Sequence, residues 1–373
     1  MKEYDYLIVG AGLFGAVFAQ EAYKSGKKCL ILEKRPHIAG NLYTEKQNNI
    51  YIHRYGAHIF HTHEKAIWDY ITQFGEFNNY IHTPVANYQG TIYPLPFNMY
   101  TFSRLWNIST PAEAESKILE QQDEISYSPH NLEEQAIKLV GRDVYAKLIK
   151  GYTEKQWGCS CKELPADIIK RLPVRYTFNN NYFNDRYQGI PNSGYTSLIE
   201  KMLAGCDIAL NTDYLADREH YNALAESIIC TCPIDAFFDY CYGALAYRSL
   251  RWEDKILSEN NFQGTAVVNY TDSSPEYTRC IEHKHFTFSK DEKGCASSGT
   301  IVSFEYGQNW QIGKEPYYPI NDNKNRQLYE KYHTLAKALP NIYFGGRLGE
   351  YKYYDMDDTI ISALNLSKQL LTE

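Results

Sequence analysis

The strongest constraint on the fold is a glycine-rich stretch at the start of the chain, YDYLIVGAGLFGAVFAQEAYKSGKKCLILEKR, which begins at residue 4. An apolar segment typical of a strand runs into three glycines, and a segment compatible with a helix follows directly. Gly10 allows a tight turn, Gly12 lets a pyrophosphate approach the backbone at the helix N-terminus, and Gly15 lets the helix pack closely on the strand. This order predicts a unit that binds a dinucleotide, and a glycine-tolerant α/β turn without a ligand is the alternative.

The residues that follow the glycines strengthen this prediction. A second apolar segment, Cys29–Leu32, has the length of a buried strand and ends in Glu33. An acidic residue about 20 positions after the glycines is the expected partner of a ribose hydroxyl. We therefore expect Glu33 to contact the ribose of the dinucleotide.

Charge and hydropathy exclude several classes of protein. A net charge of −7 over 373 residues provides no broad basic surface for nucleic acid or an anionic membrane. The longest apolar run, Leu7–Ala19, contains three glycines and is shorter than the roughly 20 residues that span a bilayer. Glu3 and Asp5 precede it, where a signal peptide would carry basic residues. We expect a cytoplasmic protein that binds neither nucleic acid nor, stably, a membrane.

The nine cysteines give no sign of a disulfide framework. Their number is odd and no secretory signal accompanies them, which is typical of free thiols in a reducing compartment. Two pairs, Cys159 with Cys161 and Cys230 with Cys232, are separated by one residue, whereas zinc sites usually place two to four residues between paired cysteines. We interpret both pairs as structural or incidental.

The rest of the chain alternates between α/β, helical and all-β character. Helices are indicated near Thr62, where apolar residues recur at helical spacing, and in segments 110–150 and 196–203. β-branched and aromatic residues indicate strands in segments 80–96, 174–178, 208–210, 227–231, 265–270, 280–288 and 300–306. The chain ends in an apolar strand, a glycine turn with Arg347, and a long helix that begins near Asp355.

These segments predict an α/β protein with a discontinuous Rossmann-like domain, a helical insertion and an antiparallel β-sheet domain. The predicted nucleotide domain comprises residues 1–79, 193–243 and 321–373. The predicted helical domain comprises residues 98–151, and the predicted sheet domain comprises residues 80–97, 152–192 and 244–320.

Ten strings follow one another along almost the whole chain: EKRPHIAGNLYT, YGAHIFHT, LPFNMYTF, IKGYTEKQWG, IIKRLPVR, NNNYFNDRYQGIPNSGYT, YRSLRWE, YTRCIEHKHF, EPYYPINDNKN and FGGRLGEYKYYDMD. Together they resemble the bacterial UDP-galactopyranose mutases. The resemblance implies that the dinucleotide is FAD. It further implies an isomerisation without net redox change, in which N5 of the reduced flavin attacks the anomeric carbon of UDP-galactopyranose and the sugar recloses as UDP-galactofuranose. A homodimer that supplies galactofuranose for surface glycans is also implied.

The resemblance carries a set of FAD contacts onto this chain. Besides the three glycines they are Phe14, Glu33, Lys34, Asn41, His58, Ile59, Asp213, Tyr214, Arg347, Met356, Asp357, Asp358, Thr359, Ile360 and Ile361. If the last helix opens at Met356, its N-terminus faces the pyrimidine edge of the flavin, where reduction places negative charge. The family pattern therefore implies that the reduced flavin is stabilised.

Two arginines match a clamp for the departing UDP. Arg171 lies in KRLPVR and Arg279 in YTRCIEH, and guanidinium groups suit a diphosphate because they stay charged and offer paired hydrogen bonds. Arg175 is the alternative to Arg171, and a surface salt bridge is the alternative role for either arginine. His58 is expected beside the flavin, as a third residue of the catalytic set.

The other substrate positions that the resemblance implies are His82, Leu148, Tyr152, Thr153, Trp157, Tyr182, Arg248, Asn269, Tyr318, Tyr353 and Asp355. Among them the tyrosines 182, 318 and 353 match phosphate ligands, and Tyr317 is the alternative to Tyr318. The chain departs from the family pattern in three places. Leu148 and Ile149 stand where some members carry two phenylalanines, Tyr100 stands where asparagine is common, and His82 replaces a small polar residue.

Other functions share some of these features. His58, His61 and His63 are close enough in sequence for a metal cluster, but the helix expected near Thr62 separates their rings, and we expect no metal. A redox flavoenzyme of the amine oxidase type and an escort protein without flavin would use the same nucleotide domain, although neither accounts for the arginines and tyrosines. UDP-N-acetylgalactosamine is the alternative substrate.

Overall fold

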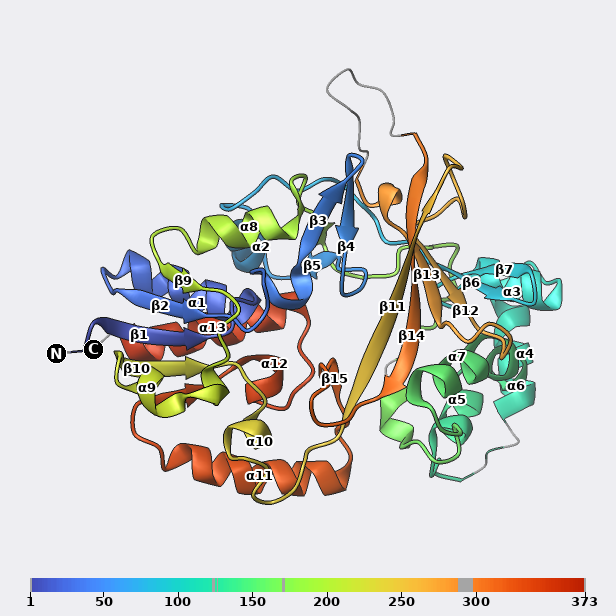
Figure 1. Ribbon diagram of the computed structural model, residues 1–373. Coiled ribbons are helices and arrows are strands. Elements are labelled where there is room, and N and C mark those ends of the chain that lie inside the picture. The colour runs from blue at the N-terminus through green and yellow to red at the C-terminus, as the bar shows by residue number, and fades with distance from the viewer. Residues whose placement is uncertain (1, 123–124, 126, 170–171, 288–297, 372–373) are drawn as a thin grey trace.

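The structure is a computed structural model and describes residues 2–122, 125, 127–169, 172–287 and 298–371. A nucleotide domain and a helical region lie at opposite ends of the molecule, and a long twisted sheet connects them (Figure 1). This arrangement confirms the predicted fold class.

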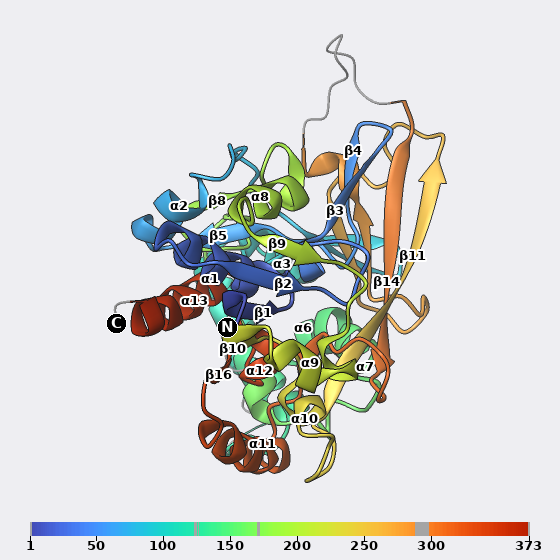
Figure 2. The ribbon, with the colours of Figure 1, turned by 60° about the vertical axis from the view of Figure 1, so that its left-hand side comes forward.

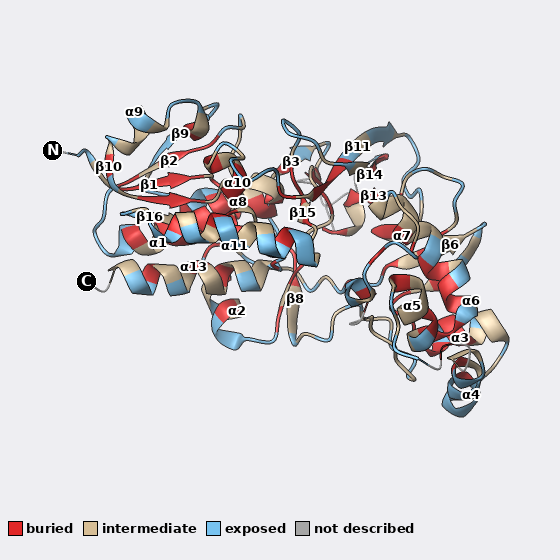
Figure 3. Cartoon of the chain, turned by 90° about the horizontal axis from the view of Figure 1, so that it is seen from below, coloured by how far each residue is buried: buried red, intermediate tan, exposed pale blue. Residues whose placement is uncertain are grey.

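A five-stranded parallel sheet forms the centre of the nucleotide domain, in the order β16-β10-β1-β2-β9. Its strands are β1 (Tyr4–Val9), β2 (Cys29–Leu32), β9 (Asp207–Ala209), β10 (Ala225–Cys230) and β16 (Ile342–Phe344). Ile8 packs into the core on one face of this sheet, whereas Leu7 and Val9 pack into the core on the other. Both faces are therefore covered, as a parallel sheet requires, and Figure 3 shows β1 and β2 as buried.

Helices from distant parts of the chain cover the two faces. On one face α1 (Leu13–Lys24) packs against α8 (Gly194–Met202) and α13 (Met356–Leu371). The other face is covered by η4 (Tyr214–Ala216), α9 (Arg218–Asn222) and α10 (Ile234–Phe237), with α11 (Asn323–Lys337) beyond them and α12 (Gly346–Gly349) preceding α13. The Tyr6 hydroxyl donates to the Leu370 carbonyl at 3.1 Å, so the first strand and the last helix lie side by side.

A seven-stranded sheet lies beside this domain, in the order β15-β11-β14-β13-β12-β6-β7. Its strands are β6 (Val85–Tyr88), β7 (Thr91–Pro94), β11 (Tyr247–Leu257), β12 (Val267–Tyr270), β13 (Arg279–Glu282), β14 (Thr300–Asn309) and β15 (Tyr318–Pro319). All neighbours are antiparallel except β12 and β6, which are parallel. The predicted antiparallel sheet is thus mixed at one pair.

Smaller elements connect the parts. They are η1 (Gly40–Leu42), β3 (Thr44–Gln47), β4 (Ile50–His53), β5 (Phe60–Thr62), α2 (Lys65–Ile71), β8 (Tyr187–Gly189) and η5 (His283–His285). The β3–β4 hairpin lies between the nucleotide domain and the long strands β11 and β14, as Figure 2 shows. This hairpin therefore carries contacts from one domain to the other.

The helical region follows the sheet strand β7. It contains α3 (Met99–Trp106), α4 (Pro111–Gln122), α5 (Leu132–Val140), α6 (Arg142–Val144), η2 (Tyr145–Ile149), α7 (Lys150–Trp157) and η3 (Ala166–Ile169). Pro111 is the first residue of α4, and the Asn131 side chain caps α5 by accepting from the Glu134 amide at 3.0 Å. Both starts follow the sequence signals. Helix α7 runs through residue 151, where the predicted helical domain ends.

Three local predictions differ from the structure. Segment 174–178 forms no strand, and Val174 makes only an isolated bridge to Phe97, because apolar and β-branched residues form a strand only where a partner strand is available. The helix predicted near Thr62 begins at Lys65, because Thr62 is the last residue of β5 and pairs with Tyr187. Strand β13 ends at Glu282, so segment 280–288 is not one strand, and Phe288 lies outside the described residues.

Candidate active site

A cavity of about 480 Å³ lies at the turn between β1 and α1. Gly10 has a positive φ of 104°, and a Cβ atom there would lie 2.3 Å from the Thr231 hydroxyl. A Cβ on Gly15 would lie 2.2 Å from the Gly10 carbonyl, so only glycine lets the helix approach the turn. At Gly12 the nearest atom would be 3.9 Å away, and no side chain caps the helix. The N-terminus of α1 is therefore open to a phosphate.

Glu33 lies at the end of β2 and has two structural bonds that the sequence did not predict. It accepts from the Ala11 amide at 3.0 Å and from the Arg35 amide at 2.9 Å, and its side chain is buried. Glu33 thus fixes the glycine turn, and it lines the cavity at the position expected of a ribose ligand.

A segment of the sheet domain covers this part of the cavity. Glu315 forms ion pairs with Lys34 at 2.7 Å and with Arg35 at 2.9 Å. Arg35 also donates to Asn41 at 3.0 Å. These contacts join residues 313–317, which line the cavity, to the loop after β2.

The opposite lining of the cavity includes His58, Arg347 and the start of α13. Arg347 donates to the Tyr354 carbonyl at 2.7 Å and to the Tyr317 carbonyl at 3.3 Å. Burial, with Arg347 next in importance, lowers the pKa of His58 to about 4. His58 is therefore neutral at physiological pH.

The structure brings most of the predicted FAD contacts to this cavity: Gly10, Gly12, Phe14, Gly15, Glu33, Lys34, Asn41, His58, Asp213, Tyr214, Arg347, Met356 and Thr359. The other predicted contacts, Ile59, Asp357, Asp358, Ile360 and Ile361, are not among the lining residues. Ile59 and Ile360 are buried in the core of the nucleotide domain. On α13 the spacing of one turn points Met356 and Thr359 toward the cavity and Ile360 toward the core.

Arg279 is the centre of a second polar cluster, on the sheet side of the cavity. It opens β13, where its register partners are Asn269 on β12 and Glu305 on β14. Arg279 donates to the Tyr152 hydroxyl at 2.5 Å, and its Nε lies 3.5 Å from the Glu305 carboxylate. Glu305 also accepts from Thr278 at 2.9 Å. Burial alone would lower the pKa of Arg279, but Glu305, followed by Tyr152, raises it, so the guanidinium stays charged.

Tyrosines connect this cluster to the cavity. The Tyr318 and Tyr353 rings stack with centroids 6.1 Å apart, and the Arg347 guanidinium lies 4.7 Å from the Tyr353 centroid. Tyr317, in contrast, lines the cofactor cavity. The positions of these rings favour Tyr318 over Tyr317 as the residue on the Arg279 side.

Three further predicted residues, Tyr182, His82 and Asp355, lie near Arg279 or Arg347. The Tyr182 ring packs against His82, with centroids 5.4 Å apart. Burial, with contributions from Arg279 and His61, lowers the pKa of His82 to about 3. Burial raises the pKa of Asp355, the residue before α13.

The remaining predicted substrate residues have structural contacts. Arg248 is buried, donates to the Gln156 carbonyl at 2.8 Å and also bonds Asn309. Trp157, at the end of α7, and Leu148 pack in the helical core, and Thr153 is buried on α7. Asn269 has a buried Oδ1 without a hydrogen-bond partner among the described residues.

Arg171 and Arg175 are the two candidates for the second arginine of the diphosphate clamp. Arg171 lies outside the described residues. Arg175 donates to the carbonyls of Asn181 and Tyr182 and to the side chain of Asn184. Arg175 therefore holds the 181–184 segment, and its guanidinium is already occupied.

The candidate metal ligands have other partners. His61 and His63 both pair with Asp185, at 2.8 and 3.0 Å. Across the described ranges, no three His, Cys, Asp or Glu side chains are grouped as metal ligands. The Cys230 and Cys232 sulfurs are 2.7 Å apart, and Cys232 lines the cofactor cavity.

Within the described part of the chain, none of the helices combines the length and hydropathy of a membrane span.

Sequence reasoning missed Arg35, Glu305 and Glu315. Arg35 directly follows the predicted Lys34, so its charge beside the nucleotide motif was the available signal. Glu305 and Glu315 act through partners far away in the sequence, and no local pattern marks them.

Comparisons with known proteins identify the family of the chain. The family model for UDP-galactopyranose mutase matches residues 147–353, and that for an NAD(P)-binding Rossmann-like domain matches residues 8–74. A probable UDP-galactopyranose mutase of Klebsiella pneumoniae is 38% identical, with 100% of this chain and 96% of the relative covered. A dTDP-fucopyranose mutase of Escherichia coli is 36% identical, with 97% of each chain covered.

The fold is also found among solved structures. A crystal structure of reduced UDP-galactopyranose mutase superimposes with a TM-score of 0.78 over 100% of this chain and 94% of that one, at 13% identity. This likeness supports the fold alone. The family model covers more than half of the chain and the relatives match it almost end to end, so the chain belongs to the UDP-galactopyranose mutase family and is an enzyme of the isomerase class.

Proposed function

We propose that the protein interconverts UDP-galactopyranose and UDP-galactofuranose with FAD bound in the cavity. The observation that carries the proposal is the position of Arg279. Its charge is held by Glu305 and Tyr152, and it lies close enough to His58 to help lower the pKa of that residue. A fixed guanidinium among hydroxyl donors suits the diphosphate of a nucleotide sugar. Membership of the mutase family supplies the reaction class.

The residues of the cavity fit FAD. Gly12 leaves the start of α1 open for a pyrophosphate, and Glu33 lies where a ribose hydroxyl is expected. Met356 and Arg347 bring the N-terminus of α13 and a positive charge to the part of the cavity that contains His58. Both would stabilise the negative charge of a reduced flavin. When bound in its reduced form, FAD supplies a nucleophilic N5 atom for the anomeric carbon of the sugar.

The chain's own residues would then stabilise the leaving group. Arg279 is aimed at the negative charge that develops on UDP, and Glu305 keeps the guanidinium in place before the reaction begins. Arg171 is proposed as the second half of the clamp. His58 is proposed beside the flavin in its neutral form.

The other substrate contacts are proposed from family membership. Phosphate ligands are Tyr182, Tyr318 and Tyr353, and residues that face the sugar or the base are His82, Leu148, Tyr152, Thr153, Trp157, Arg248, Asn269 and Asp355. A homodimer, a cytoplasmic location and a role in supplying galactofuranose for surface glycans are proposed on the same basis.

The proposal is tested by incubating dithionite-reduced protein with UDP-galactofuranose and separating the nucleotide sugars by chromatography. We expect UDP-galactopyranose to appear with reduced protein and not with oxidised protein. The purified protein should be yellow and release FAD on acid precipitation. A flavin that becomes reduced by an added amine substrate would instead favour a redox flavoenzyme, and a colourless protein without a dinucleotide would contradict the proposal.

A second candidate substrate is dTDP-fucopyranose. The dTDP-fucopyranose mutase relative is nearly as similar to this chain as the probable UDP-galactopyranose mutase, at 36% against 38% identity. Leu148 and Ile149 also depart from the phenylalanine pair of some family members. The same assay with dTDP-fucofuranose, UDP-galactofuranose and UDP-N-acetylgalactofuranosamine distinguishes the candidates through the ratios of their kcat/KM values.

A further inference from the structure

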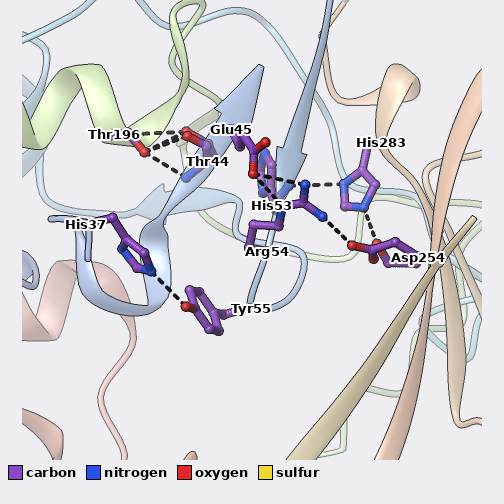
Figure 4. Close-up of polar contacts among 10 residues, drawn as sticks. His37, Thr44, Glu45, His53, Arg54, Tyr55, Thr196, Asp254 and His283 are labelled. Carbon is purple, nitrogen blue, oxygen red and sulfur yellow. Dashed lines mark hydrogen bonds and ion pairs between the residues drawn. The ribbon is translucent and has the colours of Figure 1, made fainter. Parts of the chain in front are cut away.

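A chain of hydrogen bonds leads from the cofactor cavity into the sheet domain. The His58 amide donates to His53 Nδ1 at 3.2 Å, and the His53 amide donates to His283 Nδ1 at 3.2 Å. His283 Nε2 lies 2.7 Å from the Ser303 hydroxyl, which donates to Asp254 at 2.5 Å. Figure 4 shows the part of the chain from His53 to Asp254. Of these five residues, only His58 lines the cavity.

The direction of each bond determines the position of each proton. An amide N–H can only donate, so both His53 and His283 accept at Nδ1 and carry their proton on Nε2. His283 therefore donates to Ser303, and the Ser303 proton is directed to the Asp254 carboxylate. Because His53 accepts at its ring and donates from its backbone amide, the chain of bonds fixes positions and does not pass a proton from one end to the other.

Charged side chains fix the far end of this chain. Arg54 forms ion pairs with Asp254 and, at 2.9 Å, with Glu45 (Figure 4). Asp254 and Ser303 are register partners on β11 and β14, so their contact is built into the sheet. The acceptor at the end of the chain is thus held by both strand pairing and charge.

The two inner histidines are buried and neutral. His53 is 1% and His283 0% exposed. Burial lowers the pKa of His283 to about 3 and that of His53 well below its usual value. His53 also packs against Phe286, with ring centroids 4.6 Å apart. Neutral rings are required because both Nδ1 atoms accept hydrogen bonds.

The buried His53 ring costs the protein folding free energy, which indicates that this ring has a role. His53 Nε2 is buried without a partner among the described residues, and an unpaired buried donor costs about 1–3 kcal/mol. An apolar residue at this position would avoid that cost but would lose the acceptor for the His58 amide. Gly56, which lies between His53 and His58 in the sequence, has a φ of 118°, and glycine adopts this conformation without steric cost.

We propose that His53 and His283 are positioning residues, which together with Ser303 and Asp254 hold the His58 loop against the flavin in one tautomer-defined conformation. The proposal rests on the proposed function, because it takes the ligand of the cavity to be FAD. A loop held in this way fixes the distance between His58 and the flavin and so sets the relative affinity for the two redox forms. His53 and His283 touch neither the cavity nor the substrate residues and act through His58.

The first test removes one remote link. Ser303→Ala deletes the acceptor of His283 and the contact with Asp254, whereas Ser303→Thr keeps a hydroxyl on the same strand. Ser367→Ala is the control, because Ser367 is also a buried serine with one hydrogen bond, to Ala363 on α13. The readouts are the midpoint potential of the bound flavin and the thermal midpoint of the holoprotein.

We expect Ser303→Ala to change the ratio of affinities for reduced and oxidised FAD at least tenfold, equivalent to about 30 mV for a two-electron couple. Ser303→Thr and Ser367→Ala should retain the wild-type potential. A folded Ser303→Ala protein with the wild-type potential would overturn the proposal, as would Ser303→Thr behaving like Ser303→Ala.

A second measurement does not depend on a variant or on bound flavin. NMR of wild-type protein with ¹⁵N-labelled histidine, with and without FAD, should find His53 and His283 as neutral Nε2–H tautomers between about pH 6 and 8. A proton on Nδ1 of either ring would refute the hydrogen-bond chain. A protein that binds no flavin but shows these tautomers would refute the proposed function while leaving the chain of bonds intact.

Discussion

Replacing Gly12 or Gly15 by alanine should have different effects. The first replacement should weaken FAD binding, and the second should lower the stability of the protein. A Cβ at Gly12 would be 3.9 Å from the nearest protein atom, which is an ordinary contact, so the apoprotein can accept it. The same Cβ would occupy the space proposed for the pyrophosphate. Hydrogen bonds to a charged group contribute about 1.5–3 kcal/mol each, so we expect Gly12→Ala to weaken the FAD Kd by roughly 100-fold, about 3 kcal/mol.

Gly15→Ala should destabilise the protein itself. Its Cβ would lie 2.2 Å from the Gly10 carbonyl and 3.1 Å from Ile8, whereas ordinary contacts begin at 3.4 Å. Overpacking of this kind costs about 1–3 kcal/mol, and the higher helix propensity of alanine returns about 1 kcal/mol. Because the obstacle is backbone that cannot rotate away, we expect a net loss of about 2 kcal/mol and weaker FAD binding as well.

Both variants can be measured in one experiment. Apoprotein is titrated with FAD by flavin fluorescence, and its thermal midpoint is recorded by circular dichroism. Gly75→Ala is the matched control, because its Cβ would meet only Leu198 at 3.8 Å. A loss of about 2 kcal/mol should lower the midpoint of Gly15→Ala by about 4–8 °C. The reasoning is refuted if Gly12→Ala binds FAD like wild type, or if it destabilises the apoprotein as much as Gly15→Ala does.

Four further variants test other parts of the structure. Arg279→Ala should lower kcat by about 100-fold, roughly 3 kcal/mol, at unchanged FAD content, and Tyr152→Phe should lower it less; equal steady-state rates would contradict this. Tyr332→Phe should lower stability by about 1–2 kcal/mol without affecting activity, because its fully buried hydroxyl donates to a backbone carbonyl at 2.7 Å; thermal unfolding would disprove this if the midpoint were unchanged. Burial alone would raise the pKa of Glu282, but hydrogen bonds from His285 and two backbone amides lower it from 4.5 to about 2, so its contribution of about 3 kcal/mol is present above pH 4.5 and lost toward pH 2. Acid unfolding of Glu282→Gln should therefore depend less on pH in that range, and an unchanged dependence would argue against the assignment.

Local sequence patterns predicted the elements that depend on neighbouring residues. The strand, glycine turn and helix at the N-terminus follow from steric needs within a few residues, and β2 has the predicted bounds Cys29–Leu32. The terminal helix was expected to begin near Asp355 and begins at Met356. In each case the residues that set the conformation are adjacent in the chain.

Long-range pairing was harder to predict. Strand β11 was missed although it is 11 residues long, because its second half, from Arg251, is polar and is ordered by pairing with β14, more than 40 residues later. Segment 174–178 has a strand-like composition but pairs only at one bridge. β propensity depends on the partner strand, which no local window contains.

The candidate active site shows the same difference between local patterns, which were predicted, and long-range contacts, which were not. Arg279 was predicted from resemblance, but the groups that hold it, Glu305 and Tyr152, reach it across strand register and from α7. Which charge faces which is decided by the register of β13 and β14. The resemblance therefore indicated Arg279 and Tyr152, whereas nothing in the sequence indicated that Glu305 faces Arg279.

The strand order of the nucleotide domain has a consequence for protein synthesis. The central strand β1 finds one neighbour, β2, soon after both leave the ribosome, but its other neighbour, β10, follows roughly 220 residues later. At about 5–20 residues per second, that edge of β1 waits about 10–45 s for its partner. Strand β16 and helix α13, which complete the sheet and the cavity, are made last. Cofactor loading is thus a late event, because it must follow the synthesis of β16 and α13. Until β10 has been made, the nascent chain exposes an unpaired apolar strand edge that a chaperone can protect.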